Sequence, residues 1–150
     1  MLKVGDKAPR FMLVDDSGKK ISLKDFKGKK VVLYFYPKDL TPGCTVEACD
    51  FRDASALFKK KKAVVLGVSR DSVALHKKFK EKHELNFPLL ADEDGKVCEA
   101  FGVWQEKSMY GKKYMGIART TFVIDEQGKV EQVFEKVKVK GHIDEVLEAL

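Results

Sequence analysis

The chain from position 31 to position 49 reads Val31-Val32-Leu33-Tyr34-Phe35-Tyr36-Pro37-Lys38-Asp39-Leu40-Thr41-Pro42-Gly43-Cys44-Thr45-Val46-Glu47-Ala48-Cys49. Its first six residues are all apolar or aromatic, which is typical of a strand buried on both faces of a sheet. The residues that follow predict a helix from Cys44 to Phe58. One thiol therefore stands where a strand gives way to a helix, and a second thiol, Cys49, follows five residues later.

Cys44 lies at the expected N-terminus of that helix. Unpaired backbone N–H groups and the positive end of the macrodipole stabilise negative charge there, and the thiolate is the nucleophilic form of cysteine. The amides near Gly43 and Cys44 can donate to a bound oxygen, and the Thr41 hydroxyl lies three residues ahead. Pro37 ends the strand. This setting predicts a nucleophile at Cys44, the alternative being a cysteine merely buried at a helix start.

The remaining chain alternates strands and helices. The expected elements are strands 11–14, 20–23 and 30–36, helix 44–58, strand 63–69, a helix from 71 or 72 to about 84, strand 87–91, helix 96–101, an extended loop 104–116, strands 120–125 and 129–136, and helix 142–150. This order predicts an α/β fold of thioredoxin-like architecture, with a mixed central sheet, helices on both faces and an N-terminal β-hairpin. A flavodoxin-like sheet is the alternative, but the final hairpin fits it poorly. No repeat or linker divides the chain, so we expect residues 1–150 to form a single domain.

The composition limits the class of protein. With 44% hydrophobic and 35% charged residues, the chain is typical of a soluble globular protein. No apolar run approaches the roughly 18 residues of a membrane span, and the N-terminus lacks the apolar core of a signal peptide. We therefore expect a cytoplasmic protein without a membrane partner. The net charge of +6 comes mainly from lysine rather than arginine, which argues against nucleic-acid binding.

The cysteines and histidines do not have the spacing of a metal site. A structural zinc site needs four ligands in short paired spacings, whereas the three cysteines at positions 44, 49 and 98 form no Cys-x-x-Cys pair, and the histidines at 76, 83 and 142 fall on charged stretches far from the thiols in sequence. We expect neither a metal nor a cofactor. Cys98, between the apolar Val97 and Phe101, is interpreted as core packing, with a back-up resolving or sensing role as the alternative.

The spacing of Cys44 and Cys49 creates a geometric conflict. In an intact α-helix, residues five apart lie roughly 8–9 Å apart at Cα and point about 140° away from each other. A disulfide needs Cα atoms within about 7 Å. If the two thiols react with each other, the helix around them must therefore unwind locally. Packing of Cys49 on the apolar face of the helix is the alternative.

Arg119 begins the expected strand 120–125 and could bring a guanidinium to the thiolate from across the sheet. Glu47, one turn beyond Cys44, could orient it through a carboxylate–guanidinium pair. From spacing alone, a solvated surface arginine and an arginine beside the thiolate are equally favoured.

At these residues the chain resembles a peroxiredoxin. Pro37, Thr41 and Cys44 match the family signature Pro-x-x-x-Thr-x-x-Cys. The fuller string from Tyr36 to Asp53 resembles the Q-type subgroup, also called bacterioferritin comigratory protein. The resemblance extends over essentially the whole chain, including the stretches 5–11, 102–104 and 119–122.

The resemblance implies a thiol-dependent peroxidase that reduces hydrogen peroxide and organic hydroperoxides in antioxidant defence. Cys44 matches the peroxidatic cysteine, Thr41 and Arg119 the peroxide-positioning residues, Glu47 the residue that holds the arginine, and Cys49 the resolving cysteine that forms an intramolecular disulfide with Cys44. It further implies thioredoxin, or glutaredoxin, as reductant and a monomeric state. The alternatives are a thiol–disulfide oxidoreductase, which would require the absent Cys-x-x-Cys, and a non-catalytic redox-sensing or chaperone-like module. Phe35, Tyr36, Trp104 and Met109 could line a pocket for an organic substrate, although packing is the simpler explanation.

Overall fold

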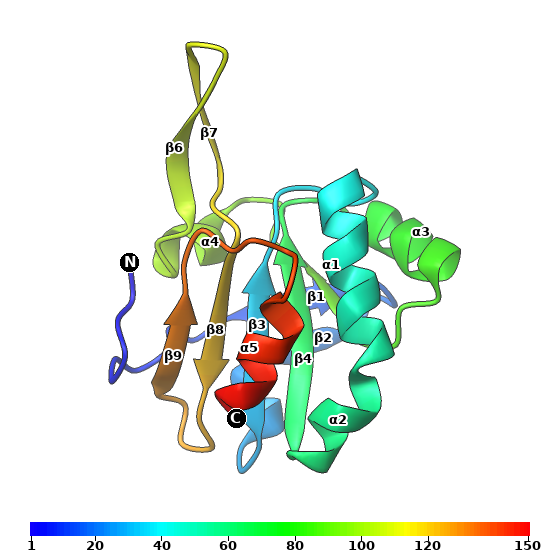
Figure 1. Ribbon diagram of the computed structural model, residues 1–150, viewed down its shortest axis with the longest axis vertical. Helices are drawn as coiled ribbons and strands as arrows, with labels where there is room; N and C mark the ends of the chain where they lie inside the picture. Colours follow the sequence, from blue (N-terminus) through cyan, green and yellow to red (C-terminus); the bar gives the residue numbers. More distant parts are fainter.

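A seven-stranded mixed sheet runs through the computed structural model, which describes residues 1–150 (Figure 1). Its strands are β1 (Met12–Asp15), β2 (Lys20–Ser22), β3 (Lys30–Phe35), β4 (Ala63–Ser69), β5 (Leu89–Ala91), β8 (Thr120–Ile124) and β9 (Val130–Phe134), in the spatial order β2-β1-β5-β4-β3-β8-β9. The three central strands β3, β4 and β5 are parallel, and antiparallel hairpins extend both edges. The predicted mixed sheet with an N-terminal hairpin is confirmed.

Helices cover both faces of this sheet, as predicted. One core cluster receives Phe51, Phe58, Phe79 and Val146 from α1 (Pro42–Asp53), α2 (Ser55–Lys60), α3 (Val73–His83) and α5 (His142–Glu148) respectively. The other receives Val97 and Cys98 from α4 (Lys96–Ala100), and it also packs against Leu23 and Phe26 of the 3-10 helix η1 (Leu23–Phe26). Strand β3 supplies alternate residues to the two clusters, because successive side chains of a strand point to opposite faces. None of the helices combines the length and the apolar character needed to cross a membrane.

The helix expected from Cys44 to Phe58 differs from the structure at its start and in its middle. It begins two residues earlier, at Pro42, because proline needs no N–H partner in the first helical turn and its φ angle suits that position. It also breaks at Ala54 into α1 and α2. At this break the Ala54 amide donates to the Asp50 carbonyl at 3.1 Å, and the Arg52 carbonyl accepts a hydrogen bond from the Asn86 side chain. A residue distant in the sequence, Asn86, therefore contacts the backbone at the break. No glycine or proline at this point of the sequence indicates that the helix ends.

The prediction of an extended loop over residues 104–116 is wrong, because this stretch forms a second, separate hairpin. Strands β6 (Trp104–Met109) and β7 (Lys112–Ile117) pair antiparallel and project from the body of the molecule as an arm (Figure 1). Tyr110 and Gly111 make the tight turn, both with positive φ angles of 51° and 78°. Most residues of the arm are polar or exposed, so the alternation that marks a half-buried strand is missing.

The register of the central strands decides which residues meet at the end of β3. Phe35, the last residue of β3, pairs with Thr120, the first residue of β8. Arg119 precedes β8, and the loop that leads to Cys44 follows β3. Antiparallel pairing therefore brings Arg119 and Cys44, 75 positions apart in the sequence, to the same edge of the sheet.

Candidate active site

Cys44 is the third residue of α1, where the helix approaches the end of β3. Its side chain is almost fully buried, with 2% exposed, and its Sγ lies 3.3 Å from Nη2 of Arg119. Pro42 occupies the first position of the helix, and Thr41 is the N-cap. The predicted setting of Cys44 at a strand-to-helix junction is present, two residues deeper into the helix than the sequence suggested.

The first amides of α1 are left unpaired. Thr41 does not cap the helix with its side chain, because its hydroxyl donates instead to the carbonyl of Lys38 at 2.8 Å. The first helical hydrogen bond runs from the Thr45 amide to the Thr41 carbonyl. The Gly43 and Cys44 amides therefore make no hydrogen bond within the protein, as expected for the first turn of a helix. Both can donate to an oxygen bound beside the thiol.

Arg119 connects Cys44 to Glu47. Its Nη1 donates to Oε1 of Glu47 at 2.6 Å, while its Nη2 donates to the Cys44 sulfur. The ion pair with Glu47 and the contact with Cys44 hold the Arg119 pKa above its ordinary value, although burial acts in the opposite direction more strongly than any single one of them. The alternative of a solvated surface arginine is therefore wrong.

Glu47 is a buried carboxyl group, only 1% exposed, on the face of α1 that turns toward the sheet. Burial raises its pKa to about 7, against the opposing effect of the Arg119 guanidinium. Its second oxygen, Oε2, has no hydrogen-bond partner. The protonation state of Glu47 thus changes near neutral pH, and with it the strength of the pair that orients Arg119.

Gly43 and Pro37 lie close to the thiol along the chain. A Cβ at position 43 would lie 3.4 Å from Nη2 of Arg119, an ordinary van der Waals contact, so Gly43 adjoins the guanidinium. Pro37 follows β3 and lines a hollow of about 510 Å³ between this loop and the arm β6–β7, together with Trp104, Lys107 and Tyr114. Of the four residues considered for an organic pocket, only Trp104 lines this hollow. Phe35 and Tyr36 belong to the core, and Met109 is exposed on the arm.

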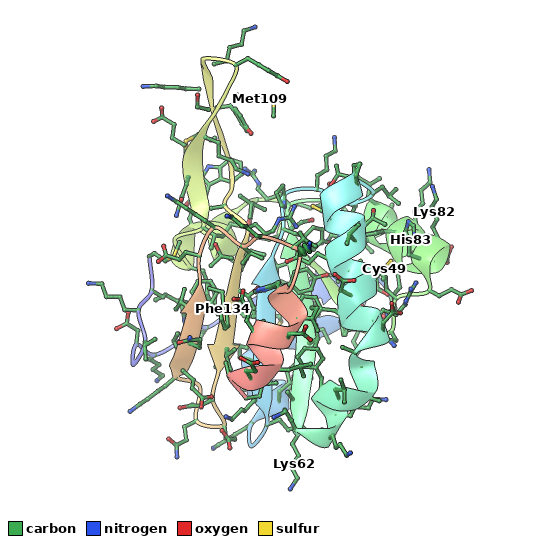
Figure 2. The ribbon with its side chains drawn as sticks, viewed as in Figure 1. Cys49, Lys62, Lys82, His83, Met109 and Phe134 are labelled. Atoms are coloured by element: carbon green, nitrogen blue, oxygen red, sulfur yellow. The ribbon has the colours of Figure 1, made fainter.

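Cys49 is partly exposed and lies on the same intact helix as Cys44 (Figure 2). All three cysteines are free thiols in this structure. Five helical positions separate the two thiols, so their side chains point about 140° apart. The geometric conflict expected from the sequence is therefore built into the folded helix.

Cys98 is not part of this site. It is completely buried in the core cluster on the other face of the sheet, where burial raises its pKa well above that of an ordinary thiol. A thiol of this kind stays protonated and unreactive at neutral pH. The interpretation of Cys98 as core packing agrees with these surroundings.

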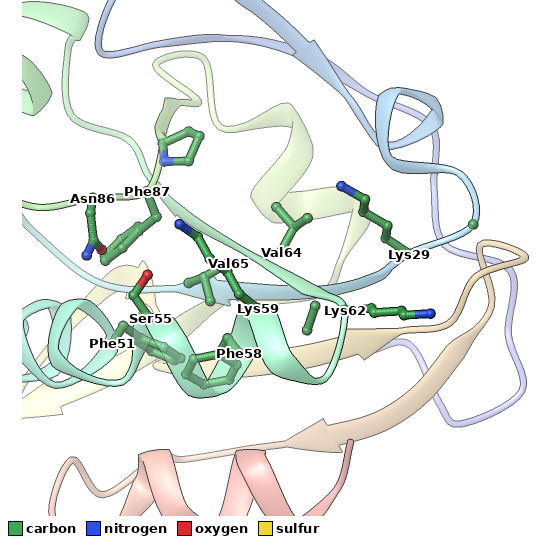
Figure 3. Close-up of a pocket in the computed structure, with 13 residues that line it drawn as sticks. Lys29, Phe51, Ser55, Phe58, Lys59, Lys62, Val64, Val65, Asn86 and Phe87 are labelled. Carbon is green, nitrogen blue, oxygen red and sulfur yellow. The ribbon is translucent and has the colours of Figure 1, made fainter.

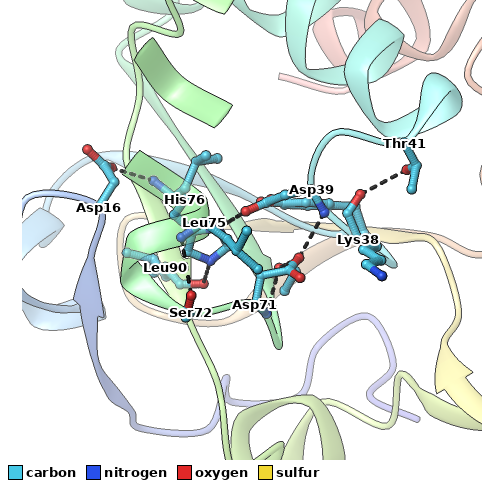
Figure 4. A network of polar contacts seen from close by, with 12 residues as sticks. Asp16, Lys38, Asp39, Thr41, Asp71, Ser72, Leu75, His76 and Leu90 are labelled. Carbon is cyan, nitrogen blue, oxygen red and sulfur yellow. Dashed lines mark hydrogen bonds and ion pairs between the residues drawn. The ribbon is translucent and has the colours of Figure 1, made fainter. Parts of the chain in front are cut away.

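A polar cluster that the sequence did not predict joins the loop that carries Thr41 to α3. Asp39, Asp71 and His76 lie close enough for their ligand atoms to share a cation, but these atoms are engaged in hydrogen bonds within the cluster (Figure 4). His76 lies on a charged stretch of the sequence, and it is nevertheless fully buried. Its spacing of three from the buried Phe79 was the signal that could have placed it on the inner face of α3.

The hollow drawn in Figure 3 lies away from the thiols. It has a volume of about 450 Å³ and is lined by residues from the beginning of β4, from α2 and from the loop before β5, among them Phe58, Lys59, Val64 and Phe87. Cys44 follows the opposite, carboxyl end of the parallel strands. None of the predicted site residues lines this hollow.

Comparison with known proteins identifies the family of this chain. The sequence profile of the AhpC/TSA family matches residues 4–133. The chain is 57% identical to a putative peroxiredoxin Bcp of Coxiella burnetii, over 97% of each chain, and 54% identical to peroxiredoxin Bcp of Bacillus subtilis, over 99% of this chain and 95% of the relative. The bacterioferritin comigratory protein of Xanthomonas campestris superposes with a TM-score of 0.88 at 47% identity, covering 93% of this chain and 88% of that one. The chain therefore belongs to the AhpC/TSA family and, within it, to the Bcp or Q-type peroxiredoxins, which are thiol-dependent peroxidases.

Proposed function

We propose that Cys44 is the peroxidatic cysteine of this peroxidase. Its thiolate attacks one oxygen of a hydroperoxide, a sulfur–oxygen bond forms as the O–O bond breaks, and the electron pair leaves with the second oxygen. After that oxygen takes up a proton, the products are water or an alcohol and the sulfenic acid of Cys44. The contact between the Cys44 sulfur and Arg119, which Glu47 in turn orients, is the observation that carries this proposal.

Arg119, Thr41 and the first amides of α1 position the peroxide. The guanidinium and the unpaired Gly43 and Cys44 amides donate to its oxygens and stabilise the charge that develops on the leaving oxygen. The Thr41 hydroxyl gives its own proton to the Lys38 carbonyl, so its lone pairs are available to accept from the peroxide O–H. Pro37 fixes a backbone angle where β3 passes into the loop that carries Thr41, and Gly43 supplies one of the free amides beside Cys44.

Cys49 resolves the sulfenic acid. Part of α1 unwinds, the Cys49 thiolate attacks the sulfenic sulfur, and an intramolecular disulfide forms as water is released. A dithiol protein, thioredoxin or glutaredoxin, then reduces this disulfide and restores two thiols. The partial exposure of Cys49 and its place on the same helix support this role over that of the deeply buried Cys98.

The substrates are hydrogen peroxide and organic hydroperoxides, within antioxidant defence. The hollow beside Pro37, which Trp104 and Tyr114 help to line, offers room for an alkyl group. The Xanthomonas campestris relative is described as having alkyl peroxide reduction activity. We propose a monomer of one domain acting in the cytoplasm, where a reducing environment keeps its three thiols free.

Stopped-flow measurement of peroxide consumption tests this function. The reduced protein should consume hydrogen peroxide and an alkyl hydroperoxide rapidly, whereas the Cys44→Ser variant should consume neither. Turnover measured in parallel with thioredoxin and glutaredoxin identifies the reductant. Retention of peroxide consumption in the Cys44→Ser variant would assign the chemistry to another group.

A further inference from the structure

A group of buried polar side chains ties the loop between β3 and α1 to helix α3 (Figure 4). His76 of α3 is 0% exposed. Its Nδ1 lies 2.6 Å from Oδ2 of Asp39, and its Nε2 lies 2.9 Å from the carbonyl oxygen of Leu90. The Tyr36 hydroxyl donates to the other oxygen of Asp39 at 2.5 Å. Each oxygen of the buried Asp39 carboxyl group therefore has a hydrogen-bond partner, Tyr36 or His76.

The protons of this group can be counted from its partners. The Leu90 carbonyl can only accept, so Nε2 of His76 carries a proton. A second proton lies between Nδ1 and the Asp39 carboxyl group, and the pair has no net charge whichever atom holds it. Such a pair can be buried without an uncompensated charge. Removal of its proton donor leaves a buried carboxyl group unsatisfied.

The same cluster determines the backbone of the loop. The Asp39 amide donates to Oδ2 of Asp71 at 2.8 Å, and Ser69 donates to the same oxygen at 2.7 Å. Leu40, the next residue, has a φ of 63°, in the left-handed region that a residue with a Cβ rarely adopts. Contacts with α3 and its flanking residues, rather than local preference, therefore hold the loop in the shape that directs the Thr41 hydroxyl to the Lys38 carbonyl.

The opposite end of α1 is held by the same part of the molecule. Nη1 of Arg52 donates to the carbonyl of His83, the last residue of α3, at 2.7 Å. The Asn86 side chain donates to the Arg52 carbonyl at 3.2 Å. Cys44 and Cys49 lie between these two attachments. Helix α3 and the residues beside it thus hold both ends of the segment that has to open.

We propose that His76, acting through Asp39, is a positioning residue that holds the N-terminal end of this segment throughout turnover. Opening is then confined to the stretch between Thr41 and Arg52, and the loop that positions the peroxide keeps its shape while the disulfide exists. The inference rests on the roles proposed for Cys44 and Cys49. Asp39 and His76 touch neither thiol nor peroxide, so they act by holding the loop.

Two substitutions of His76 separate this role from simple packing. In His76→Asn, the amide nitrogen replaces Nδ1 and keeps a donor toward Asp39. In His76→Gln, the amide nitrogen replaces Nε2 and keeps a donor toward Leu90, while the donor toward Asp39 is lost. Positioning through Asp39 predicts that the rate constant for Cys44 oxidation by peroxide falls about tenfold in His76→Gln and less than threefold in His76→Asn. Packing alone predicts the reverse order, because asparagine leaves the larger cavity.

Trp104, the single tryptophan, lines the hollow beside Pro37 and provides a fluorescence signal for stopped-flow experiments. The peroxide step and the later disulfide step are measured separately in each variant. Disulfide formation should be as fast in His76→Gln as in the wild type, since a loosened loop does not oppose opening. Lys82→Gln, an exposed residue of the same helix outside the cluster, and Val146→Ala, a buried truncation in α5, serve as controls and should leave the peroxide step unchanged.

Hydrogen exchange of the Asp39 amide tests the anchor directly. In the disulfide form of the wild type, this amide should stay protected while the amides of residues 44–50 exchange rapidly. In His76→Gln, it should lose protection at least tenfold. An Asp39 amide that exchanges as fast as residues 44–50 in the oxidised wild type, or equal peroxide rates in the two His76 variants, would overturn the inference. A wild type that fails to react with peroxide or to form the disulfide would instead refute the proposed function.

Discussion

The Arg119 guanidinium donates to the buried Glu47 carboxyl group through Nη1, over a distance of 2.6 Å. Since Glu47 lies on α1 and Arg119 directly before β8, this pair joins the helix to the sheet. It also leaves Nη2 directed at the Cys44 sulfur. Arg119, which contacts the thiol, is thus also held by Glu47 of the helix that carries Cys44, and the opening proposed for α1 would separate all three residues.

Replacement of Arg119 by lysine should slow the reaction with peroxide about 100-fold, the usual effect of removing one positioned donor at a developing charge. Lysine keeps the charge but cannot contact Glu47 and the sulfur at once through a planar fork. Stopped-flow measurement of the second-order rate constant checks this. The Arg10→Lys variant, altered at an exposed position, is the control. A rate within twofold of the wild type in Arg119→Lys would show that charge alone suffices.

The raised pKa of Glu47 makes folding stability depend on pH in a defined direction. The folded protein holds the Glu47 proton up to about pH 7, whereas the ordinary value is 4.5. The contribution of this group to the free energy of unfolding is therefore complete below pH 4.5 and is lost as pH rises through 7. In urea unfolding, the free energy of unfolding should fall between pH 5 and pH 8. This fall should be about 2 to 3 kcal/mol larger in the wild type than in Glu47→Gln.

The exposed Glu126→Gln variant provides the matched comparison for this titration and should behave as the wild type does. The rate of Cys44 oxidation should also gain from ionisation of Glu47, since the carboxylate form holds Arg119 more strongly. Equal pH dependence of unfolding in the wild type and in Glu47→Gln would contradict the raised pKa.

Cys49→Ser should consume about one equivalent of peroxide and then stop. The sulfenic acid of Cys44 still forms in this variant, but no thiol remains in α1 to convert it into a disulfide that thioredoxin can reduce. The readout is peroxide consumed per protein in the presence of thioredoxin, thioredoxin reductase and NADPH. Cys98→Ser removes a thiol that lies on the other face of the sheet and should turn over normally. Repeated turnover by Cys49→Ser would transfer the resolving role to another group.

Oxidation should change the protein within α1 only. Because the disulfide cannot form across five residues of an intact helix, far-UV circular dichroism should report lower helicity in the oxidised form, and hydrogen exchange should accelerate over residues 44–50. The amides of α2 (Ser55–Lys60) form the internal control and should exchange equally in both forms. Identical exchange over residues 44–50 in the two redox forms would defeat the unwinding step.

The sequence predicted the elements whose signals are local. The apolar run 31–36 and the strand Ala63–Ser69 are β3 and β4, and Ser72 caps α3 as its residue type suggests. Cys44 could be placed because a thiol after a buried strand is a local signal. Spacing alone did not decide whether Arg119 lies at the surface or beside the thiol, since its contact with Cys44 depends on the register of β3 and β8. The family resemblance settled that choice in the direction that the structure shows.

The features that the sequence did not predict depend on partners far along the chain. The arm β6–β7 has no buried face to impose alternation on its residues, so only the turn at Tyr110 and Gly111 marked it. The break at Ala54 coincides with a bond from Asn86 to the Arg52 carbonyl. His76 stood in a lysine-rich stretch whose overall polarity concealed the inner face of α3.

The interruption at Ala54 has a consequence for the kinetics of the catalytic cycle. Because α2 is a separate helix with Phe58 in the core, we expect the unwinding proposed for α1 to stop at residue 53. In the proposed cycle, α1 then re-forms, after reduction of the disulfide, against a sheet and a neighbouring helix that stay in place. Such a reclosure is a helix–coil event on a timescale of about a microsecond, rather than a refolding reaction. We therefore expect recovery of the fold to add little to the time between turnovers.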